Sequence, residues 1–475
     1  MSAKLSMLTA LLAISLAGRS QEVWDLPRCV DYALKNNISV RQADLQSQFS
    51  ALAIKQGRAS QLPTLNVNSN AGYRFGLSDN PTTGILENNR FFNLGMQAQS
   101  QVTIFNWFSI RNSNAANDLT YEADKEQTRK IQNDVALNVA VGYLQILLAN
   151  EQVKIAQITA EQTKAQLERT RKMVAAEQLP ELNALQLEAQ LARDSANIAA
   201  GQASVQSFEL QLKALLNLDA AAPFRIATPP VEAIPIKTLA ELQPETVYAS
   251  ALANLPQQKV NELRIKAAIK NMQAAKGNMY PTIAAFGSLA TNYVNIKTPV
   301  FSTGPKQATG ATVTVSGTDY DVLAPTRIPV GETATPLGQQ LRNNFGQNIG
   351  IGLSIPILNG RSARTAWDRS KLTVKNLELT KEQGDMQLKQ DIYKAYVDAV
   401  SALQQFNSNQ KAVSANETAY SFAEKRYEQG LLSTYDLLNT QAALQSARTQ
   451  LVLAQYDYVF KMKLLEFYRG QGLSL

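Results

Sequence analysis

Side chains that commonly carry out chemistry are scarce in this sequence. Its 475 residues include no histidine and one cysteine, Cys29, beside 46 Lys and Arg and 39 Asp and Glu residues, a formal net charge of +7. Without imidazole the chain lacks the commonest general base and metal ligand, and one thiol supplies neither an internal disulfide nor a thiolate zinc or iron–sulfur site. The glycine-dotted segment 346–360 lacks the Lys-Ser/Thr of a phosphate-binding loop. We therefore expect neither an enzyme nor a cofactor.

Two turns separate long helical patterns in the sequence. The second turn contains Gly430, Leu431, Leu432 and Ser433, with Tyr427 before it and Asp436 and Asn439 after it; the first contains Glu177, Gln178, Leu179 and Pro180, followed by Asn183. Gly430 suits the left-handed end of a helix, and Ser433 with Asp436 suits a helix N-cap with an acidic first turn. Pro180 suits the first helical position. Hydrogen bonding at helix ends is the chemistry that these residues offer by themselves.

The first 20 residues have the pattern of a secretory signal peptide. Lys4 precedes an apolar run from Leu5 to Ala17, and small residues follow, so the mature chain is expected to start near Gln21. No later segment has the roughly 18 uninterrupted apolar residues of a membrane helix. Cys29 lies too far past the apolar run for a lipoprotein signal, so a buried, inert thiol is expected. The mature charge of +5, without Lys4 and Arg19, is too mild to indicate nucleic-acid binding.

The chain contains an internal duplication. Matches recur at offsets of 218 and then 253 residues: Ala33 with Ala251, Leu45 with Leu263, Pro63 with Pro281, Asn106 with Asn359, Arg111 with Arg364, Tyr143 with Tyr396 and Leu191 with Leu444. The difference of 35 residues is expected as a loop insertion within 297–347. We expect a signal peptide at 1–20, a first repeat at 21–217, a proline-rich linker without a long helix at 218–248, and a second repeat at 249–475. Each repeat has the order helix, strand, strand, very long helix, tip, long helix.

Alternating side chains predict strands of an outer-membrane barrel. Apolar residues such as Leu65, Val67, Tyr73 and Phe75 alternate with polar ones, the return strand 92–104 alternates too, and so does 345–357. The third strand, 283–296, alternates poorly. Lipid-facing apolar residues alternating with polar lumen residues are the signature of such barrels. The predicted lumen residues are Asn66, Asn68, Asn70, Gln97, Gln99, Gln101 and Asn348, and the predicted aromatic girdle is Tyr73, Phe75, Phe91 and Phe92. The alternative is a soluble sandwich with one wet face.

Four strands cannot close a barrel, and lipid does not tolerate an open sheet edge. The chain is therefore expected to oligomerise before it enters a membrane. Two copies would give eight strands, whose interior side chains normally fill, whereas three copies would give twelve and leave a passage. The small, neutral lumen residues favour three copies.

Residues 108–176 predict one very long helix. At about 1.5 Å per residue it would extend on the order of 100 Å, too far for a compact domain. Apolar and small residues recur along it in steps of four and three, beginning Val135, Val139, Gly142 and Ile146 and ending Leu167, Thr170 and Val174, and the same register returns 253 residues later. A thin seam on an otherwise polar helix predicts a wall that is wet on both sides. The alternative is a fibrous coiled coil.

Taken together, these segments resemble the TolC-like outer membrane efflux protein family over essentially the whole mature chain. The resemblance rests on the duplicated plan, on the Pro-Thr-Leu and Pro-Thr-Ile elbows at Pro63 and Pro281, on the run from Ile355 to Gly360, and on the second tip from Arg426 to Leu438. It implies a mixed α and β membrane fold: a trimeric, twelve-stranded outer-membrane β-barrel, with four strands per chain, that continues into a long α-helical coiled-coil barrel in the periplasm. It also implies a periplasmic adaptor and an inner-membrane pump or secretion ATPase as partners.

The resemblance also implies roles for the tip residues. Gly430, Leu431, Leu432 and Ser433 match the family's adaptor-docking segment, while Glu177, Gln178, Leu179 and Pro180 in the first repeat depart from it. Tyr427 matches a gating tyrosine and Asp436 the first carboxylate of an acidic periplasmic aperture. The second carboxylate position is Asn439, and the first-repeat equivalent of Asp436 is Asn183, so the acidic aperture is at most half present.

The expected function is passive conduction of small molecules through the outer membrane, driven by the pump. An exit channel for type I protein secretion is an alternative within this reading. An exported structural or adhesive coiled-coil protein is the alternative from another class.

Overall fold

The computed structural model describes residues 23–79, 86–228, 234 and 238–470. The predicted signal peptide lies outside these residues. The described chain contains no helix that is both long and apolar enough to cross a membrane. Its residues group into two compact units. The first consists of the segments up to residue 54, 116–269 and 372 onward, and the second consists of residues 55–115 and 270–371. Each unit draws on both halves of the duplicated sequence.

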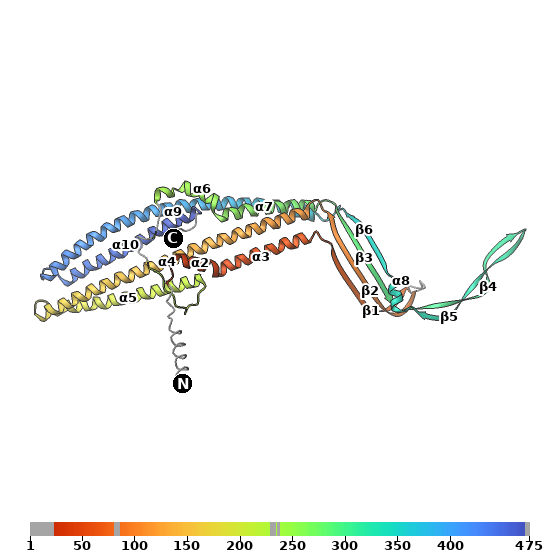
Figure 1. Cartoon of the computed structure of the whole chain (residues 1–475), viewed down its shortest axis with the longest axis horizontal. Coiled ribbons are helices and arrows are strands. Elements are labelled where there is room, and N and C mark those ends of the chain that lie inside the picture. Colours follow the sequence, from red (N-terminus) through yellow and green to blue (C-terminus); the bar gives the residue numbers. More distant parts are fainter. Residues whose placement is uncertain (1–22, 80–85, 229–233, 235–237, 471–475) are drawn as a thin grey trace, which may run out of the picture. The chain divides into compact units, whose positions relative to one another are not determined.

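Two long helical hairpins dominate the first unit. They consist of α4 (Ser109–Ala175) with α5 (Glu181–Leu216), and α9 (Ser362–Glu428) with α10 (Thr434–Tyr468). The hairpins lie side by side along their length (Figure 1). Both α4 and α9 have 67 residues, and their ends differ by the offset of 253 found in the sequence. The predicted helix 108–176 is therefore confirmed to within one residue at each end.

The predicted seam is buried in both hairpins. In α4, Val139, Ile146, Thr163 and Thr170 are all fully buried, and in α9 Ile392, Ala399 and Tyr427 are at most 1% exposed. Outside the seam most residues of these helices are half-buried or exposed, with Tyr143, Leu144 and Leu147 of α4 as buried exceptions. Small seam residues let neighbouring helices approach closely, which explains why long helices with little overall amphipathicity pack at all.

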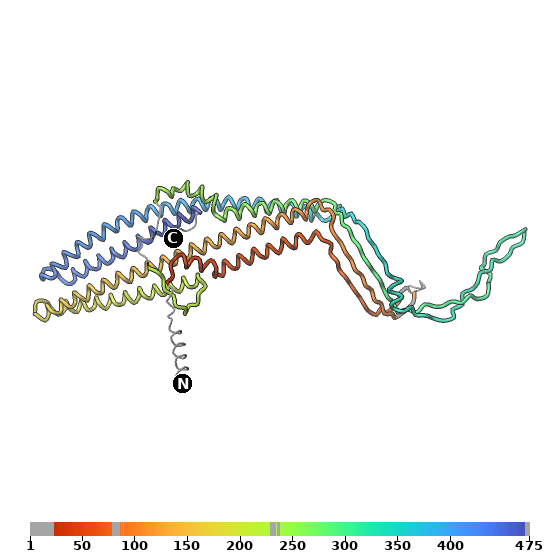
Figure 2. Tube along the Cα trace, in the orientation of Figure 1, coloured from red at the N-terminus to blue at the C-terminus, as the bar shows by residue number. Residues whose placement is uncertain are grey.

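Shorter helices flank the hairpins. They are α2 (Leu26–Asn36), α3 (Ile38–Ala59), α6 (Pro244–Asn254) and α7 (Pro256–Gly277), with a short 3₁₀ helix, η2 (Leu239–Leu242). The breaks at Asn37 and Leu255 differ by the offset of 218. Figure 2 shows the Cα trace of these helices, with α2 and α3 in red and α6 and α7 in green. The predicted proline-rich linker indeed contains no long helix in its described residues, and within it Ile226 bridges to Trp24.

Cys29 belongs to the core beneath these helices, with Tyr143 and Leu212 among its fully or nearly fully buried partners. The thiol is 0% exposed, and burial, with a smaller contribution from Asp25, raises its pKa to about 12. The prediction of a buried thiol is confirmed, and a thiol that stays protonated at neutral pH is a poor nucleophile.

Four antiparallel strands form the main sheet of the second unit. They are β1 (Thr64–Asp79), β2 (Leu86–Phe105), β3 (Thr282–Val294) and β6 (Gly346–Ser354), in the order β1-β2-β3-β6. As predicted, Pro63 and Pro281 each lie directly before a strand, since proline and the residue preceding it disfavour a continuing helix. The predicted strand 345–357 ends earlier, at Ser354.

The insertion expected as a loop within 297–347 is wrong in part, because most of it, including residues 298–344, is ordered as strand and helix. It contains β4 (Lys297–Val315) and β5 (Thr318–Ala334), which form a separate two-stranded antiparallel ribbon, followed by α8 (Leu337–Asn343). Glycine and proline made the segment look irregular. The ladder accommodates them through three register shifts, where the pairing is interrupted.

Candidate functional site

The polar side chains of the main sheet line one face in aligned rows. Asn66 is paired with Gln99. On the other side of β2, Gln99 is paired with Ser288, and Ser288 with Asn348. The remaining predicted lumen residues lie on the same face of the sheet, two or four positions along each strand from Asn66 and Gln99. They are Asn68, Asn70, Gln97 and Gln101. The strand register therefore brings these residues together on one surface of neutral hydrogen-bonding groups, whose role as a lumen stays a prediction.

Phe286 also lies on this polar face, which the sequence did not predict. It is paired with Gln101 on one side and with Gly350 on the other. A Cβ atom built on Gly350 would lie 2.9 Å from Cζ of Phe286, so the ring covers the glycine and uses the space that a side chain would need. The broken alternation of the third strand therefore has a physical reason: one large ring packs over a glycine of the next strand.

The opposite face of the sheet is apolar and uncovered in the single chain. Ile349 is 91% exposed, Leu65 72% and Ile351 72%. The ring of Tyr73 contacts those of Phe75 and Phe92 in the half of the sheet where β1 ends and β2 begins. Phe91 does not join them as predicted, because it is paired with Arg74 and lies on the polar face. An apolar surface of this extent requires a non-aqueous neighbour.

The second helical tip, between α9 and α10, has a glycine turn followed by a side-chain cap. Gly430 has a φ of 70°, and the amide of Leu431 donates to the carbonyl oxygen of Arg426 over 2.9 Å. This is the Schellman pattern that ends a helix at a left-handed residue. Ser433 is the N-cap of α10, and its Oγ accepts from the amide of Asp436 over 3.1 Å. The predicted helix-end roles of these residues are confirmed.

The first helical tip, between α4 and α5, has the same turn without the glycine. Glu177 has a φ of 54°, and the amide of Gln178 donates to the carbonyl oxygen of Met173 over 2.9 Å. Pro180 occupies the N-cap position of α5, not the first helical position that we expected, and gives no side-chain hydrogen bond. Proline has no side-chain group to accept from the first amides of the helix, although the main-chain carbonyl oxygen of Pro180 accepts from the amide of Asn183 over 3.1 Å.

Tyr427 joins the two hairpins near the second tip. Its side chain is 1% exposed. Its hydroxyl lies 3.0 Å from Oγ1 of Thr170 in α4 and 3.2 Å from Oγ1 of Thr434 in α10. A ring buried in the seam with hydrogen bonds to both neighbours fixes the spacing of the hairpins. Tyr427 is thus a packing residue in this chain, and a gating role would have to act through this contact.

Two further contacts cross between the hairpins. Arg169 of α4 forms a salt bridge with Glu428 of α9 at 2.5 Å, with both side chains about half exposed. Deeper in the bundle, Thr163 donates to the buried carboxylate of Asp194 over 2.7 Å and accepts from Gln441 of α10 over 2.9 Å. The sequence showed neither contact, because the partners lie on helices distant in the chain.

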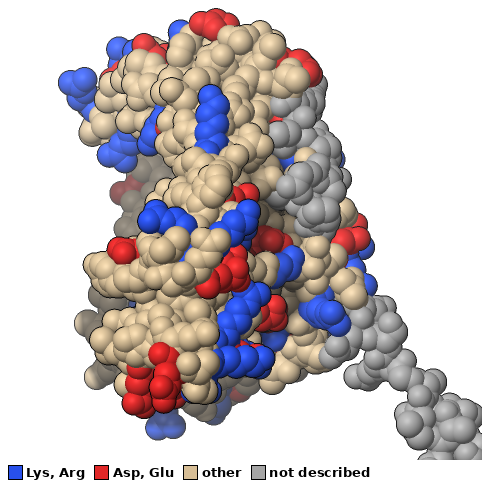
Figure 3. Space-filling view, turned by 90° about the vertical axis from the view of Figure 1, so that its left-hand side faces the viewer, with Lys and Arg blue, Asp and Glu red and all other residues tan. Residues whose placement is uncertain are grey.

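The predicted aperture residues do not form one cluster within the chain. Asp436 and Asn439 are exposed and Asn183 is half-buried. The side chain of Asp436 accepts from Oγ of Ser433 over 2.6 Å, which is a local contact. Seen from the side of the tips, basic and acidic side chains are interspersed and neither sign forms a continuous patch (Figure 3).

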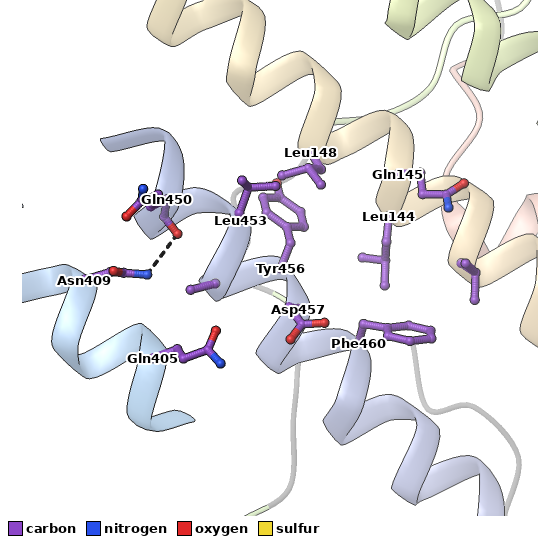
Figure 4. A pocket seen from close by; sticks show the side chains of 12 residues that line it. Leu144, Gln145, Leu148, Gln405, Asn409, Gln450, Leu453, Tyr456, Asp457 and Phe460 are labelled. Carbon is purple, nitrogen blue, oxygen red and sulfur yellow. Dashed lines mark hydrogen bonds between the residues drawn. The ribbon is translucent and has the colours of Figure 1, made fainter. Parts of the chain in front are cut away.

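A cavity of about 680 Å³ lies between α4, α9 and α10. Figure 4 shows Leu144 beside Phe460 and Leu148 beside Tyr456, with Gln405 and Asn409 of α9 on another wall. On that wall the amide of Asn409 donates to the main-chain carbonyl oxygen of Gln450 over 3.2 Å. The cavity has the size of small-molecule sites. Within the described residues, no group of three or more His, Cys, Asp and Glu side chains is placed to hold a metal ion.

Comparisons with known proteins agree with this geometry. The family model described as "Outer membrane efflux protein" matches residues 29–218 and 330–469. The probable outer membrane lipoprotein SilC of Salmonella typhimurium is 22% identical over 438 residues, covering 90% of this chain and 82% of SilC. Outer membrane protein TolC of Escherichia coli K12 is 21% identical over 466 residues, covering 95% of this chain and 84% of TolC.

Solved structures share the fold. CusC superposes with a TM-score of 0.74 at 17% identity, covering 94% of this chain and 92% of CusC. The outer membrane protein VceC of Vibrio cholerae superposes with a TM-score of 0.70 at 15% identity, covering 94% of this chain and 97% of VceC. The mixed fold expected from the sequence, with four strands of the chain in one sheet and long paired helices, is confirmed.

Proposed function

Because the chain belongs to the outer membrane efflux protein family, we propose that it is the outer-membrane exit duct of a tripartite efflux pump and passively conducts small molecules to the exterior. The family consists of outer-membrane channels and not of enzymes. The observation that carries the proposal is the incomplete main sheet, with one polar face, one exposed apolar face and two unpaired edges.

The unpaired edges require further copies of the chain. β1 and β6 end the sheet, and each would present unpaired amide and carbonyl groups to lipid, at several kcal/mol per group. Three copies would join β6 of one chain to β1 of the next and close twelve strands. A barrel of twelve strands is wide enough for a passage, whereas eight strands enclose mainly side chains. The aligned Asn, Gln and Ser rows would then face water.

The two hairpins of each chain would form the wall of a periplasmic tube. Three copies supply six hairpins, whose buried seams hold neighbours together while their polar faces meet water on either side. In this arrangement residues 21–217 and 249–475 are the two repeats and 218–248 connects them. The tube needs no catalytic group, since the partner pump provides the energy.

The tips are the proposed contact with a periplasmic adaptor. Leu431 is 64% exposed beside the rigid turn at Gly430, and an exposed apolar side chain on a fixed turn is suited to docking. The docking set is Gly430, Leu431, Leu432 and Ser433 with Glu177, Gln178, Leu179 and Pro180. The periplasmic aperture is proposed to form where Tyr427, Asp436, Asn439 and Asn183 of three chains approach the axis.

A deletion strain tests the function. Removal of the chain should raise the intracellular accumulation of a fluorescent efflux substrate, and the wild-type chain should restore efflux. A Leu431→Glu variant should fail to restore it and fail to co-purify with the adaptor, while still reaching the outer membrane. Unchanged accumulation in the deletion strain for a broad set of small molecules would contradict the proposed substrate class.

Protein secretion is a second candidate. The alkaline protease secretion protein AprF of Pseudomonas aeruginosa is 25% identical over 123 residues, which is 26% of this chain. Loss of a secreted protein from the medium of the deletion strain, with normal small-molecule accumulation, would favour this candidate. Release of the chain from membranes without detergent would instead favour an exported coiled-coil protein.

A further inference from the structure

The distal half of the β4–β5 ribbon is amphipathic. Val313 is paired with Tyr320, and Val315 with Thr318, so these side chains share one face. That face is uncovered in the single chain, with Val313 52%, Val315 54% and Tyr320 57% exposed. The other face carries Thr312, Thr314, Asp319 and Asp321, which alternate with the apolar residues along the strands. The ribbon closes through Ser316 and Gly317, both with positive φ, as in a tight hairpin turn.

Such a ribbon is unfavourable alone in water. An isolated two-stranded hairpin is at best marginally stable, and an apolar face needs a partner to bury it. β4 has 19 residues, which corresponds to roughly 60 Å at about 3.3 Å per residue. The tip of the ribbon therefore lies well beyond reach of the sheet that carries it, and its apolar face requires a partner from outside this chain.

Helix α8, which follows β5, is hydrogen-bonded to the end of β3, the strand that precedes the ribbon. The side-chain amide of Gln340 accepts from the amide of Val294 over 3.0 Å and donates to its carbonyl oxygen over 2.9 Å. It thereby replaces a neighbouring strand at the end of β3. Oγ1 of Thr291 adds a hydrogen bond to the carbonyl oxygen of Leu341 over 2.8 Å. Only two residues connect β3 to β4, so each copy of the sheet fixes where its ribbon starts.

The half of the ribbon next to the main sheet, here called the root half, is poorly suited to pairing its edges with another strand. It contains Pro299, Pro305, Pro325 and Pro329. Proline has no amide hydrogen to donate to a neighbouring strand, and its presence on edge strands limits edge-to-edge association. The distal half, in contrast, has no proline and has one apolar face. Contact through that face is therefore favoured over continuous extension of the ribbon as a sheet.

We propose that the apolar ribbon tips of neighbouring copies of this chain pack face to face and form a collar at the exterior mouth of the channel. The inference rests on the proposed trimer, which sets the ribbon roots side by side around one axis. The acidic faces with Asp319 and Asp321 then point away from one another, because like charges brought together in the collar would repel. A second copy thus buries the apolar face and leaves the acidic face in water. The collar narrows the exit without altering the barrel.

Cysteine cross-linking tests the collar on the assembled protein in outer membranes. The native thiol at Cys29 is buried, so it provides a silent background. In Val313→Cys, oxidation should join two protomers into a covalent dimer within the trimer. In the matched control Thr314→Cys, whose side chain lies on the acidic face, cross-linking should be at least tenfold lower.

The trimer itself is measured in the same samples from its mass after mild detergent extraction. An intact trimer with equal or absent cross-linking at both positions would overturn the collar and leave the duct intact. A cross-link from Val313→Cys to another protein would also overturn it, in favour of a different partner. Absence of the trimer would contradict the proposed function instead.

A second variant measures the same contact without cysteine. Tyr320→Asp should place a charge in the collar, so protease cleavage between 309 and 322 should increase several-fold while the trimer persists. Equal protection of the wild type and Tyr320→Asp would contradict the packing of the tips.

Discussion

Gly430 and Glu177 occupy equivalent positions in the two helical tips, and both have left-handed backbones with φ of 70° and 54°. The hydrogen bonds that close the two turns also correspond and have the same length of 2.9 Å. A left-handed conformation is nearly free for glycine but costs an L-residue roughly 1–2 kcal/mol. The comparison shows that the paired helices impose the turn, and that only the second repeat has the residue best suited to it.

The side chains around the turns differ more than the backbones. Ser433 caps α10 whereas Pro180 leaves α5 uncapped. Tyr427 bonds to both neighbouring helices, while its equivalent in the first tip is the aliphatic Val174. The side chain of Tyr427 therefore makes a contact between the hairpins that Val174 cannot reproduce, and a change at Tyr427 should matter more for the spacing of the hairpins.

The largest expected effect follows replacement of Tyr427. In Tyr427→Ala a buried ring is lost, which commonly costs about 3–5 kcal/mol. Amide hydrogen exchange near the ends of α9 and α10 should accelerate accordingly, and the conductance of the closed channel should rise. Tyr427→Phe keeps the ring and loses only hydrogen bonds, at about 0.5–1.5 kcal/mol each. Val174→Ala is the matched change in the first tip, and an equal effect there would remove the proposed asymmetry.

Exchange of the turn residues should change the stability of the two tips in opposite directions. Glu177→Gly should stabilise the first tip by about 1 kcal/mol. Glycine adopts the left-handed conformation without strain, and the greater conformational entropy of glycine in the unfolded chain cancels only part of this gain. Gly430→Glu should destabilise the second tip by a similar amount. Local hydrogen exchange at each tip measures both changes. Changes of the same sign would show that the turns are not equivalent.

The side-chain cap of Ser433 should contribute about as much to the stability of the second tip as the glycine turn does, or slightly less. Ser433→Ala should destabilise the start of α10 by about 1 kcal/mol, whereas Ser433→Asp should preserve the cap. Because Ser433 is also a proposed docking residue, adaptor binding separates the two roles. If Ser433→Asp keeps the tip stable but weakens adaptor binding, docking is established; if both are unchanged, capping alone explains the residue.

The smallest effect is expected for the salt bridge between Arg169 and Glu428. Both side chains are about half exposed, and exposed pairs typically contribute about 0.2–1 kcal/mol. Arg169→Ala should therefore shift hydrogen exchange at the tips slightly, and the shift should disappear at about 1 M salt, where charges are screened within roughly 3 Å. A large effect that persists in high salt would indicate a contact beyond this ion pair.

The sequence predicted those features that have strong local signals. The predicted long helix 108–176 matches α4 to within a residue at each end, and Pro63 and Pro281 located the starts of β1 and β3. The ribbon of β4 and β5 was missed because its prolines and glycines resemble a loop, although they lie in paired strands. Nothing in the local sequence indicates that Glu177 has a left-handed backbone conformation. Only its position, 253 residues before Gly430, could have indicated this conformation.

The candidate site was predictable in outline but not in its contacts. The polar rows follow from alternation, yet Phe286 on the same face depends on Gly350 in another strand. The hydrogen bonds of Tyr427 and the network of Thr163, Asp194 and Gln441 join helices far apart in the chain. Such contacts depend on the packing of the hairpins, which the spacing of residues along one helix does not specify.

In the proposed assembly, three copies of this chain enclose one water-filled passage. The decisive experiment is single-channel recording of the detergent-purified protein in planar bilayers, with the mass of the same preparation measured in parallel. We expect a trimer with discrete conductance steps that increase in Tyr427→Ala. A monomer, or a trimer that never conducts in either form, would contradict it.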